Sequence, residues 1–318
     1  MNNISTDIHK AKTILEQDNL VAIPTETVYG LAGNAFSETA IKKIFATKNR
    51  PLFNPLIVHI HSKELLDDIA EKVPQKAYRL AEAFWPGSLT LVVKKKSDIP
   101  YLVTAGKNTV AVRVPNHPLT LSLLQLLDFP LVAPSANPFG SISPTAAEHV
   151  ANYFPETVPL ILDGGICESG IESTIIGFEE DEPIVYRLGA IAIEAIEAVV
   201  GKVKVMNTEE AAPEAPGMLL KHYAPKTKTI IVDDIENFLK ENSLPKIGTI
   251  TFFKKIEHNN LVHQEVLSER KDFKEAAANL YQAMHRLDKM NLNLIIAEPF
   301  PDENLGKSIN DRLNRATK

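Results

Sequence analysis

The stretch Leu20-Val-Ala-Ile-Pro-Thr-Glu-Thr-Val-Tyr-Gly-Leu31 joins a short apolar run to a proline and several small hydroxyl side chains. The apolar run ends at Pro24, which is typical of a buried strand that stops abruptly. Backbone N–H groups beyond such a strand end are unpaired, and hydroxyl or cationic side chains beside them can hold a polyanion. Lys48-Asn-Arg50 and Ala133-Pro-Ser-Ala-Asn137 repeat this arrangement. Together the three segments predict an anion-binding enzyme cleft.

Similar apolar runs recur through the first two thirds of the chain and predict the strands of one large sheet. They are Leu20 to Ile23, Leu56 to Ile60, Leu89 to Val93, Val110 to Val114, Leu131 to Ala133, Leu160 to Leu162, Thr174 to Phe178 and Ile184 to Tyr186. Helical patterns lie between them, near residues 7–18, 38–47, 63–71, 74–84, 118–127, 144–153 and 190–200. Ser143-Pro144 predicts the start of one helix, because Pro is favoured directly after a Ser cap. The expected fold is a mixed α/β domain.

A change of composition marks the end of this domain. The segment Val205-Met-Asn-Thr-Glu-Glu-Ala-Ala-Pro-Glu-Ala-Pro-Gly217 lacks hydrophobic periodicity and is rich in Pro, Ala and Glu, which is typical of an extended linker. Beyond it, strands alternate with helices, which predicts a small three-layer α/β domain with a largely parallel, Rossmann-like sheet. We expect a catalytic domain over residues 1–205, a linker over 206–227 and a second domain over 228–318.

Composition agrees with two soluble domains. The chain has 318 residues, 44% hydrophobic and 23% charged, and one domain usually holds roughly 100–200 residues. No apolar run approaches the roughly 18 residues that span a bilayer, and the N-terminus lacks the features of a secretory signal. We therefore expect a cytoplasmic protein without membrane contact.

Charge and cysteine content speak against a nucleic-acid-binding protein, a disulfide-bonded protein and a cysteine-based metal site. Residues 1–205 hold 18 Lys and Arg against 23 Asp and Glu, a net charge of −5, and the remainder carries −1. Neither part has the basic surface expected of a protein that mainly grips nucleic acid. The single cysteine, Cys167, excludes an intramolecular disulfide and a cysteine-based metal cluster. It is either a nucleophile or a small buried thiol, and we assign it no role.

Four cations adjoin strand ends or turns: Lys48, Arg50, Arg113 and Arg187. The proline after Arg50 disfavours continued helix, so Lys48 and Arg50 are expected to project from one extended segment and clamp phosphates. Arg113 lies within an otherwise apolar strand, where it must snorkel, pair with a carboxylate or face a polar cavity.

Hydroxyl and imidazole groups surround the same strand ends. His59 lies in an apolar strand and is either a satisfied core residue or a catalytic group. Thr25, Thr27 and Tyr29 follow one strand and Ser135 follows another, where ligands collect in open sheets. Each hydroxyl alone is explained by turn capping, whereas the whole set favours a ligand. The motifs of P-loop, zinc-protease and serine-hydrolase enzymes are absent.

These motifs, in this order, resemble the YrdC-like family of threonylcarbamoyl-AMP synthases over residues 1 to about 205. The matching segments are Pro24-Thr-Glu-Thr-Val-Tyr-Gly30, Lys48-Asn-Arg-Pro51, Asn54-Pro-Leu-Ile-Val-His59, Trp85-Pro-Gly87, Val110 to Arg113, Ala133 to Asn137, Glu172-Ser-Thr-Ile-Ile176 and Arg187. Pro216-Gly-Met-Leu-Leu-Lys-His-Tyr-Ala-Pro225 resembles the linker of the two-domain members. The resemblance implies a YrdC-like twisted sheet with flanking helices and a C-terminal domain.

It also implies a reaction. L-threonine, bicarbonate or CO₂, and ATP with Mg²⁺ would give threonylcarbamoyl-AMP and pyrophosphate, and a downstream tRNA threonylcarbamoyl-transferase complex would use the product to modify tRNA. Direct tRNA binding is expected to be weak or absent. The sequence assigns no metal ligands and no oligomeric state.

The resemblance places residues around two substrates. Thr27, His59, Arg113, Ala133 and Ser173 are implied at threonine, with Arg113 suited to a bidentate grip on its carboxylate. Lys48 and Arg50 are implied as catalytic. The residues implied at ATP are Lys48, Arg50, Asn54, Thr109, Ser135, Asn137, Ser143, Arg187 and Tyr223.

Some residues differ from the family pattern, and two alternative functions remain open. Leu188 stands where many members have Pro, and Leu219-Leu220 fill linker positions that are often polar or aromatic; we expect both to tune packing. We expect the linker, with Lys221, His222 and Tyr223, to act as a gate over the cleft. The alternatives are an RNA-binding module and a carbamoyl-transfer enzyme of the hydrogenase-maturation type, whose cysteine-rich zinc fingers a single Cys cannot supply.

Overall fold

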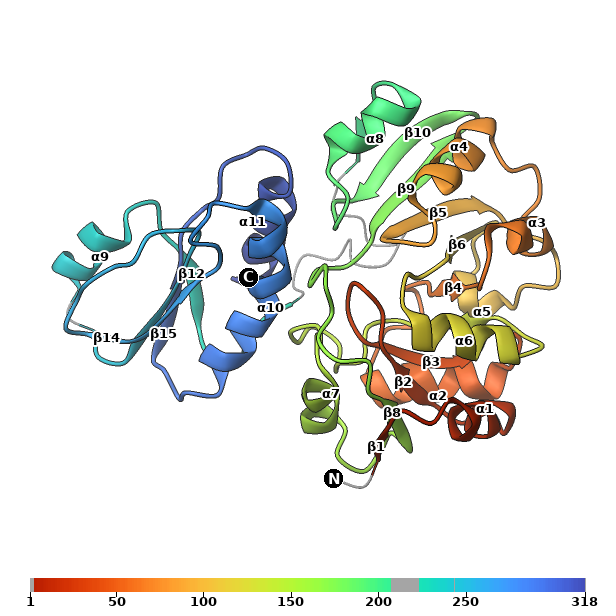
Figure 1. Cartoon of the computed structure of the whole chain (residues 1–318), viewed down its shortest axis with the longest axis horizontal. Coiled ribbons are helices and arrows are strands. Elements are labelled where there is room, and N and C mark those ends of the chain that lie inside the picture. Colours follow the sequence, from red (N-terminus) through yellow and green to blue (C-terminus); the bar gives the residue numbers. More distant parts are fainter. Residues whose placement is uncertain (1–2, 207–222, 243, 318) are drawn as a thin grey trace.

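The computed structural model describes residues 3–206, 223–242 and 244–317. Among them, an 11-stranded mixed sheet and a four-stranded sheet form two α/β units (Figure 1). The strand order of the large sheet is β1-β8-β2-β3-β7-β4-β6-β5-β9-β10-β11. Its strands are β1 (Ile4–Ser5), β2 (Val21–Ile23), β3 (Gly30–Asn34), β4 (Ile57–His59), β5 (Leu89–Lys94), β6 (Thr109–Arg113), β7 (Leu131–Val132), β8 (Leu160–Leu162), β9 (Thr174–Glu179), β10 (Glu182–Arg187) and β11 (Lys204–Val205).

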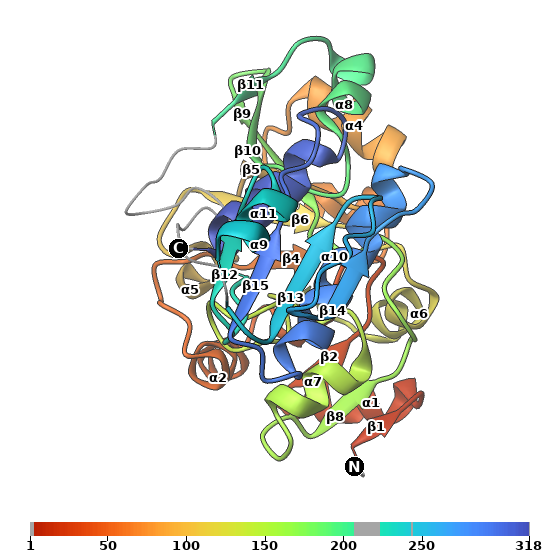
Figure 2. The ribbon, with the colours of Figure 1, turned by 90° about the vertical axis from the view of Figure 1, so that its left-hand side faces the viewer.

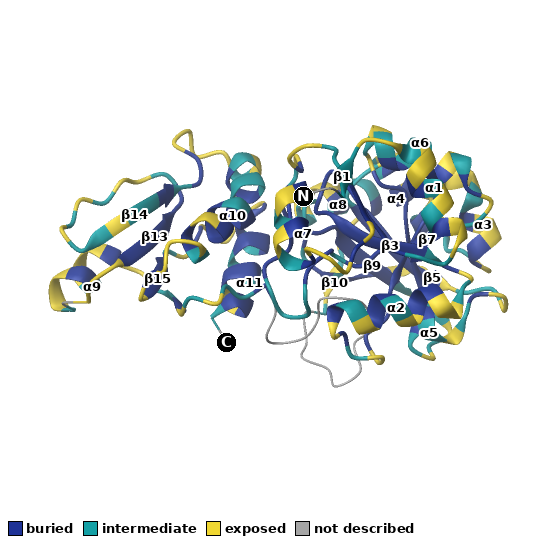
Figure 3. Ribbon diagram, turned by 90° about the horizontal axis from the view of Figure 1, so that it is seen from below, coloured by how far each residue is buried: buried dark blue, intermediate teal, exposed yellow. Residues whose placement is uncertain are grey.

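Helices cover both faces of this sheet, as Figure 3 shows by the buried strands between helices with exposed outer sides. Leu15 of α1 and Leu123 of α6 belong to the core on one face, whereas Ile44 of α2, Leu80 of α4 and Ile196 of α8 belong to the core on the other. The helices are α1 (Ile8–Glu16), α2 (Glu38–Lys48), α3 (Leu66–Ile69), α4 (Gln75–Phe84), α5 (Tyr101–Thr104), α6 (Pro118–Leu126), α7 (Ala147–Tyr153) and α8 (Ile193–Val200).

The eight predicted strands are all present, but β3 and the two-residue edge strands β1 and β11 were not expected. The sequence of β3, Gly-Leu-Ala-Gly-Asn, has none of the Val and Ile that mark a strand. A Cβ on Gly30 would lie 3.0 Å from the Cβ of Ala133, so a larger residue there would force its neighbour to shift. The strand therefore forms through close backbone packing between β2 and β7.

Two local expectations were wrong. Helix α7 begins at Ala147, after Ala146 as its cap, because the Ser143 hydroxyl instead donates to the carboxylate of Glu172 at 2.6 Å. Lys48 and Arg50 do not share an extended segment. Lys48 ends helix α2, and Asn49 caps it in the left-handed conformation with φ 51°, which Asn tolerates better than most residues.

The second sheet is parallel throughout, with the order β12-β15-β13-β14 (Figure 2). Leu239 of α9 packs with Ile296 on one face, and Leu280 of α10 and Leu313 of α11 pack with Ile295 on the other. The three-layer prediction is therefore confirmed. The elements are β12 (Thr229–Ile231), α9 (Ile235–Glu241), β13 (Ile247–Thr251), β14 (Leu261–Val266), α10 (Phe273–Asp288), β15 (Leu294–Ala297) and α11 (Gly306–Ala316).

Helices α10 and α11 face the large sheet's unit (Figure 1). Val28, Ile142 and Ile171 of the first unit lie in the same hydrophobic cluster as Leu280 of α10. The backbones approach closely at Gly170, where φ is 68° and a Cβ would lie 2.4 Å from the backbone of Ala278. The two units thus share one apolar interface. No helix in the described part of the chain is long and apolar enough to cross a membrane.

Candidate functional site

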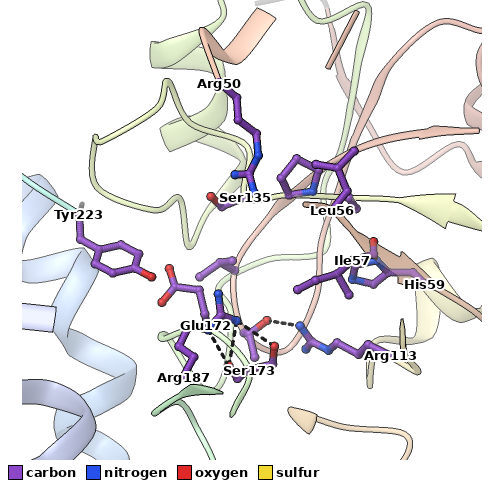
Figure 4. Close-up of a pocket in the computed structure, with 14 residues that line it drawn as sticks. Arg50, Leu56, Ile57, His59, Arg113, Ser135, Glu172, Ser173, Arg187 and Tyr223 are labelled. Carbon is purple, nitrogen blue, oxygen red and sulfur yellow. Dashed lines mark hydrogen bonds between the residues drawn. The ribbon is translucent and has the colours of Figure 1, made fainter. Parts of the chain in front are cut away.

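A pocket opens where several strands of the large sheet end and the second unit begins (Figure 4). It contains about 530 Å³ of empty space, including the part open to solvent. Residues in or beside the strands β2, β4, β6, β7, β9 and β10 line it, together with one residue of the loop after α2 and one residue of the expected linker. The lining residues are Thr27, Val28, Arg50, Leu56, Ile57, His59, Arg113, Ala133, Pro134, Ser135, Glu172, Ser173, Arg187 and Tyr223.

Arg113 defines one end of the pocket. Its side chain is buried, its Nε donates to the carbonyl of Gly87 at 3.2 Å, and one terminal nitrogen donates to Thr27 Oγ1 at 2.9 Å. The other terminal nitrogen forms an ion pair with Glu26 at 2.6 Å. Burial alone would raise the pKa of Glu26, but the Arg113 guanidinium holds that pKa below its usual value. Arg113 therefore pairs with a carboxylate and faces a polar cavity at once.

His59 neighbours Arg113 across the parallel strands β4 and β6, where the two are register partners. Burial, and after it the charge of Arg113, lowers the pKa of His59 to about 3, so the ring is neutral at physiological pH. Its Nδ1 lies 3.1 Å from the carbonyl of Ile57, which can only accept. Nδ1 therefore carries the proton, and Nε2 is the acceptor that this side chain offers.

Arg187 and Ser173 form the middle of the pocket wall. The guanidinium donates from Nε and a terminal nitrogen to the Ser173 carbonyl, at 3.1 and 2.8 Å, and from the terminal nitrogen to Ser173 Oγ at 3.0 Å. Ser173 Oγ also lies 2.7 Å from Thr90 Oγ1. An irregularity in the β9–β10 pairing falls between Val185 and Arg187, and such irregularities re-aim side chains at sites.

Arg50 defines the opposite end of the pocket (Figure 4). Its guanidinium donates to the Asn54 carbonyl at 3.2 Å, to Asn54 Oδ1 at 2.8 Å and to the Pro55 carbonyl at 2.7 Å. Burial, followed by repulsion from Arg187, lowers the pKa of Arg50, and burial also lowers the pKa of Arg187. Two buried guanidinium groups that disfavour each other would be stabilised by an anion between them.

Lys48 lies behind this end of the pocket. The side chain is 1% exposed, and its ammonium donates to the carbonyls of Ser135 and Asn137. Burial, and after it the charge of Arg50, lowers the pKa of Lys48 well below its usual value. In this conformation Lys48 holds the loop that carries Ser135, and a phosphate contact for Lys48 stays a prediction.

Glu172 is the carboxylate in the pocket wall. Ser143 Oγ donates to it, and Tyr281 and Arg312 of the second unit do the same. Burial alone would raise the pKa of Glu172, but Arg312, then Arg187 and Ser143, lower it to about 2. The carboxylate is therefore ionised at every physiological pH.

The structure brings most of the expected site residues together. Thr27, Arg50, His59, Arg113, Ala133, Ser135, Ser173, Arg187 and Tyr223 line the pocket. Four others lie behind its lining: Lys48, Asn54, Asn137 and Ser143. Thr109 begins β6, whereas Arg113 ends it, so Thr109 is remote from the pocket and gains no support. Lys221 and His222 lie outside the described residues.

Four residues around the pocket were not expected: Glu26, Glu172, Tyr281 and Arg312. Glu26 had a signal in the sequence, because a cation in the apolar strand β6 requires a carboxylate partner or a polar cavity. Arg312 and Tyr281 had none, since they lie 140 and 109 residues from Glu172 in the sequence.

Two family models match the chain. One, described as Telomere recombination (Sua5, YciO and YrdC), matches residues 13–189, and the other, described as Threonylcarbamoyl-AMP synthase, C-terminal domain, matches residues 191–317. The chain belongs to the threonylcarbamoyl-AMP synthase family. The resemblance inferred from the sequence motifs is therefore confirmed.

Relatives match along nearly the whole chain. The threonylcarbamoyl-AMP synthase of Pyrococcus abyssi is 38% identical over 98% of this chain and 94% of its own length. That of Bacillus subtilis is 40% identical over 97% and 92%. The crystal structure of P. abyssi Sua5 complexed with L-threonine superposes with a TM-score of 0.90 over 98% of this chain and 94% of that chain. The predicted YrdC-like fold with a C-terminal domain is thereby confirmed.

A more remote likeness is to another solved structure. Full-length HypF, in its phosphate- and nucleotide-bound form, is 20% identical with a TM-score of 0.53, and covers 58% of this chain but 29% of its own. At this identity the likeness shows a shared fold alone.

Proposed function

We propose that the chain catalyses the reaction for which its family is named. L-threonine and bicarbonate or CO₂ form threonine carbamate, a carbamate oxygen attacks the α-phosphorus of ATP, and pyrophosphate leaves with the electrons of the broken P–O bond. The observation that carries this proposal is one pocket lined by three buried cations: Arg50 lies at one end, and Arg113 and Arg187 lie on either side of Ser173 at the other (Figure 4). A small carboxylate and a polyphosphate are complementary to those two ends.

The Arg113 end would hold threonine. The N–H groups of the Arg113 guanidinium that Gly87, Thr27 and Glu26 do not use can donate to the threonine carboxylate, and Glu26 compensates the charge of Arg113. Neutral His59 would offer Nε2 to the hydroxyl or amino group of threonine. Ser173 and the backbone near Ala133 would complete this end.

The other end would hold ATP. Arg50 and Arg187 would stabilise the negative charge that builds on the phosphoryl oxygens during attack. Ser135, Asn54, Asn137 and Ser143 would shape the nucleotide site, and Tyr223 would close over it. Lys48 would reach a phosphate only after leaving the carbonyls that it now contacts.

Magnesium would enter the pocket bound to the phosphates of ATP. Among the described residues, no group of three or more His, Cys, Asp or Glu side chains could hold a metal ion, and the pocket's own carboxylate, Glu172, is already engaged by three donors. The protein residues therefore do not fit a dedicated Mg²⁺ cage. Mg²⁺ is commonly bound through substrate phosphates, and MgATP is the form that we propose.

The pocket offers little acid–base machinery. His59 is neutral, and Glu172 is ionised but saturated with donors. Threonine carbamate can form without an enzyme, so the protein would act mainly by positioning the carbamate oxygen against the phosphorus. Orientation of this kind can supply a large part of a rate enhancement.

Residues 1–205 would form the catalytic domain, 206–227 a linker that gates the pocket, and 228–318 the second domain. The product would pass to a tRNA threonylcarbamoyl-transferase complex, in a cytoplasmic setting. Direct tRNA binding would be weak, because residues 1–205 carry a net charge of −5.

The test is pyrophosphate release by the purified chain with ATP and Mg²⁺, with threonine and bicarbonate each added or omitted. Release that requires both substrates is the expected result. A folded sample that binds ATP and releases no pyrophosphate would overturn the proposal. Salt-dependent tRNA retardation would then test the RNA-binding alternative, since binding that survives physiological salt would support it.

A further inference from the structure

Two short segments of the first unit meet beside the pocket: residues 172–174, which lead into β9, and residues 188–190, which follow β10. We call them the two wall segments. The Ala190 amide of one donates to the Glu172 carbonyl of the other at 3.0 Å. A Cβ on Gly189 would lie 2.5 Å from the same carbonyl oxygen. The backbones of the two wall segments are therefore in direct contact.

Ser173 belongs to the first wall segment and lines the pocket (Figure 4). Its side chain is 1% exposed, and its hydroxyl oxygen lies 2.7 Å from Thr90 Oγ1. Because Ser173 follows Glu172 directly in the chain, a displacement of Glu172 also moves Ser173. A misplacement of about 1 Å in a site can cost about a hundredfold in rate. The position of Ser173 thus depends on what holds the wall segments.

Arg312 of helix α11, in the second unit, binds both wall segments at once. Its Nε donates to Glu172 Oε2 at 2.8 Å, and one terminal nitrogen donates to the Leu188 carbonyl at 2.7 Å. The other terminal nitrogen donates to Asp311 at 2.6 Å. The side chain is fully buried, and a charge buried this deeply is tolerated only when it is paired and hydrogen-bonded. Arg312 is therefore fixed as a bridge between the two wall segments.

Two further side chains of the second unit each hold one wall segment. Ser308, on α11 four residues before Arg312, is 2% exposed and donates to the Gly189 carbonyl at 2.8 Å. Tyr281 of α10 donates to Glu172 Oε2 at 3.0 Å. A buried acceptor that loses its donor is costly, so removal of these donors would favour a shift of the wall segments toward other partners.

We propose that Arg312, Ser308 and Tyr281 are positioning residues for threonine binding: they hold the two wall segments together so that Ser173 keeps its place in the pocket wall. None of the three lines the pocket itself. This inference rests on the proposed function, because it assumes that Ser173 contacts threonine. It gives the second unit a defined part in substrate binding.

The test is a double-mutant cycle in the full-length chain. Arg312→Met removes the bridge between the wall segments, Ser173→Ala removes the hydroxyl in the pocket, and a double variant carries both changes. Ser308→Ala removes the hydrogen bond to the second wall segment alone. The readouts are the calorimetric Kd for L-threonine and the melting temperature.

Two control variants separate positioning from other effects. Lys307→Met also removes a cation from α11, but Lys307 pairs with Glu194 across the interface at 2.7 Å nearer the surface. Leu239→Ala removes a buried side chain of α9 from the core on the opposite face of the second sheet. It should lower the melting temperature without touching either wall segment.

We expect Arg312→Met to raise the Kd for threonine about tenfold, the effect of one lost hydrogen bond to a charged group. Ser173→Ala should raise it by a similar factor. The double variant should bind threonine within about twofold of Ser173→Ala alone, because only independent effects multiply. Ser308→Ala should give a smaller rise, and the two control variants none.

Wild-type threonine affinity in Arg312→Met, or a double variant whose loss is the product of the two single losses, would overturn the inference. An equal loss in Leu239→Ala would also overturn it, because destabilisation alone would then explain the effect. If Arg312→Met does not fold, the cycle of Ser308→Ala with Ser173→Ala decides by the same criteria. Failure of the proposed function is distinguishable, because wild type itself would then neither bind threonine nor release pyrophosphate.

Discussion

The ion pair of Arg113 and Glu26 makes substitution of Arg113 a test of two separate effects. Arg113→Met removes the proposed grip on the threonine carboxylate and also leaves Glu26 buried without its cation. The first effect concerns binding and the second concerns folding. A third variant, Arg113→Met with Glu26→Gln, separates them, because it restores charge balance without restoring the grip.

Both magnitudes follow from the contacts. Truncating one partner of a buried, hydrogen-bonded charge pair costs about 2–5 kcal/mol in binding, so the Kd for threonine should rise by about 30-fold to several thousandfold. Leaving an unpaired buried charge costs about 3–5 kcal/mol of stability. We expect the lower part of the stability range, because the Ser88 hydroxyl at 3.1 Å and the Asn116 amide at 2.9 Å still donate to Glu26.

The assay is titration calorimetry with threonine and with ATP, combined with denaturant unfolding. Arg113→Met should lose threonine affinity and stability, while ATP affinity changes by no more than about twofold, as expected for a separate site. The double variant should recover stability alone. Equal losses for threonine and ATP, or recovery of threonine binding in the double variant, would refute the assignment.

Three further predictions concern the interface and the buried titratable groups. Gly170→Ala should lower the melting temperature and the rate of pyrophosphate release together, because φ is 68° and the new Cβ would meet the Ala278 backbone at 2.4 Å; normal values for both would contradict the close packing. Glu172 has a pKa depressed to about 2, so its contribution to stability is complete above its unfolded value near 4.5 and is lost as pH falls toward 2; acid unfolding should therefore be less steep in the double variant Glu172→Gln with Arg312→Met. His59→Gln should keep the flat pH profile of pyrophosphate release between about pH 6 and 8, because His59 does not titrate there; a pH-dependent step in wild type that disappears in the variant would contradict a neutral His59.

Much of the fold could be predicted because its signals are local. The apolar runs of the large sheet and the alternation of strands and helices after residue 227 are patterns within short windows of sequence. Strand β3 had no such signal, since its sequence Gly-Leu-Ala-Gly-Asn has no Val or Ile and the strand is defined by its pairing with β2 and β7. At Ser143 the local signal was misleading. The Ser-Pro pattern is typical of a helix start, but the Ser143 hydroxyl donates to the buried carboxylate of Glu172 instead.

The site residues also fall into those that the sequence could predict and those that it could not. Arg113, Arg50 and Arg187 could be found because cations beside strand ends are unusual in any apolar context. Their partners depend on the tertiary fold. Glu26 reaches Arg113 across 87 residues of sequence, and Arg312 reaches Glu172 across 140, so no local pattern connects them.

The hydrophobic cluster shared by the two units has a consequence for folding cooperativity. Domains joined by a modest polar interface commonly move and unfold separately, but here Val28, next to Thr27 of the pocket, packs in one cluster with Leu280 of α10. Local opening of α10 would therefore remove support from the backbone next to Thr27, at the Arg113 end of the pocket. We therefore expect the Arg113 end of the pocket and the second domain to unfold as one cooperative unit, so that helices of the second domain partly set the pocket's resistance to local unfolding.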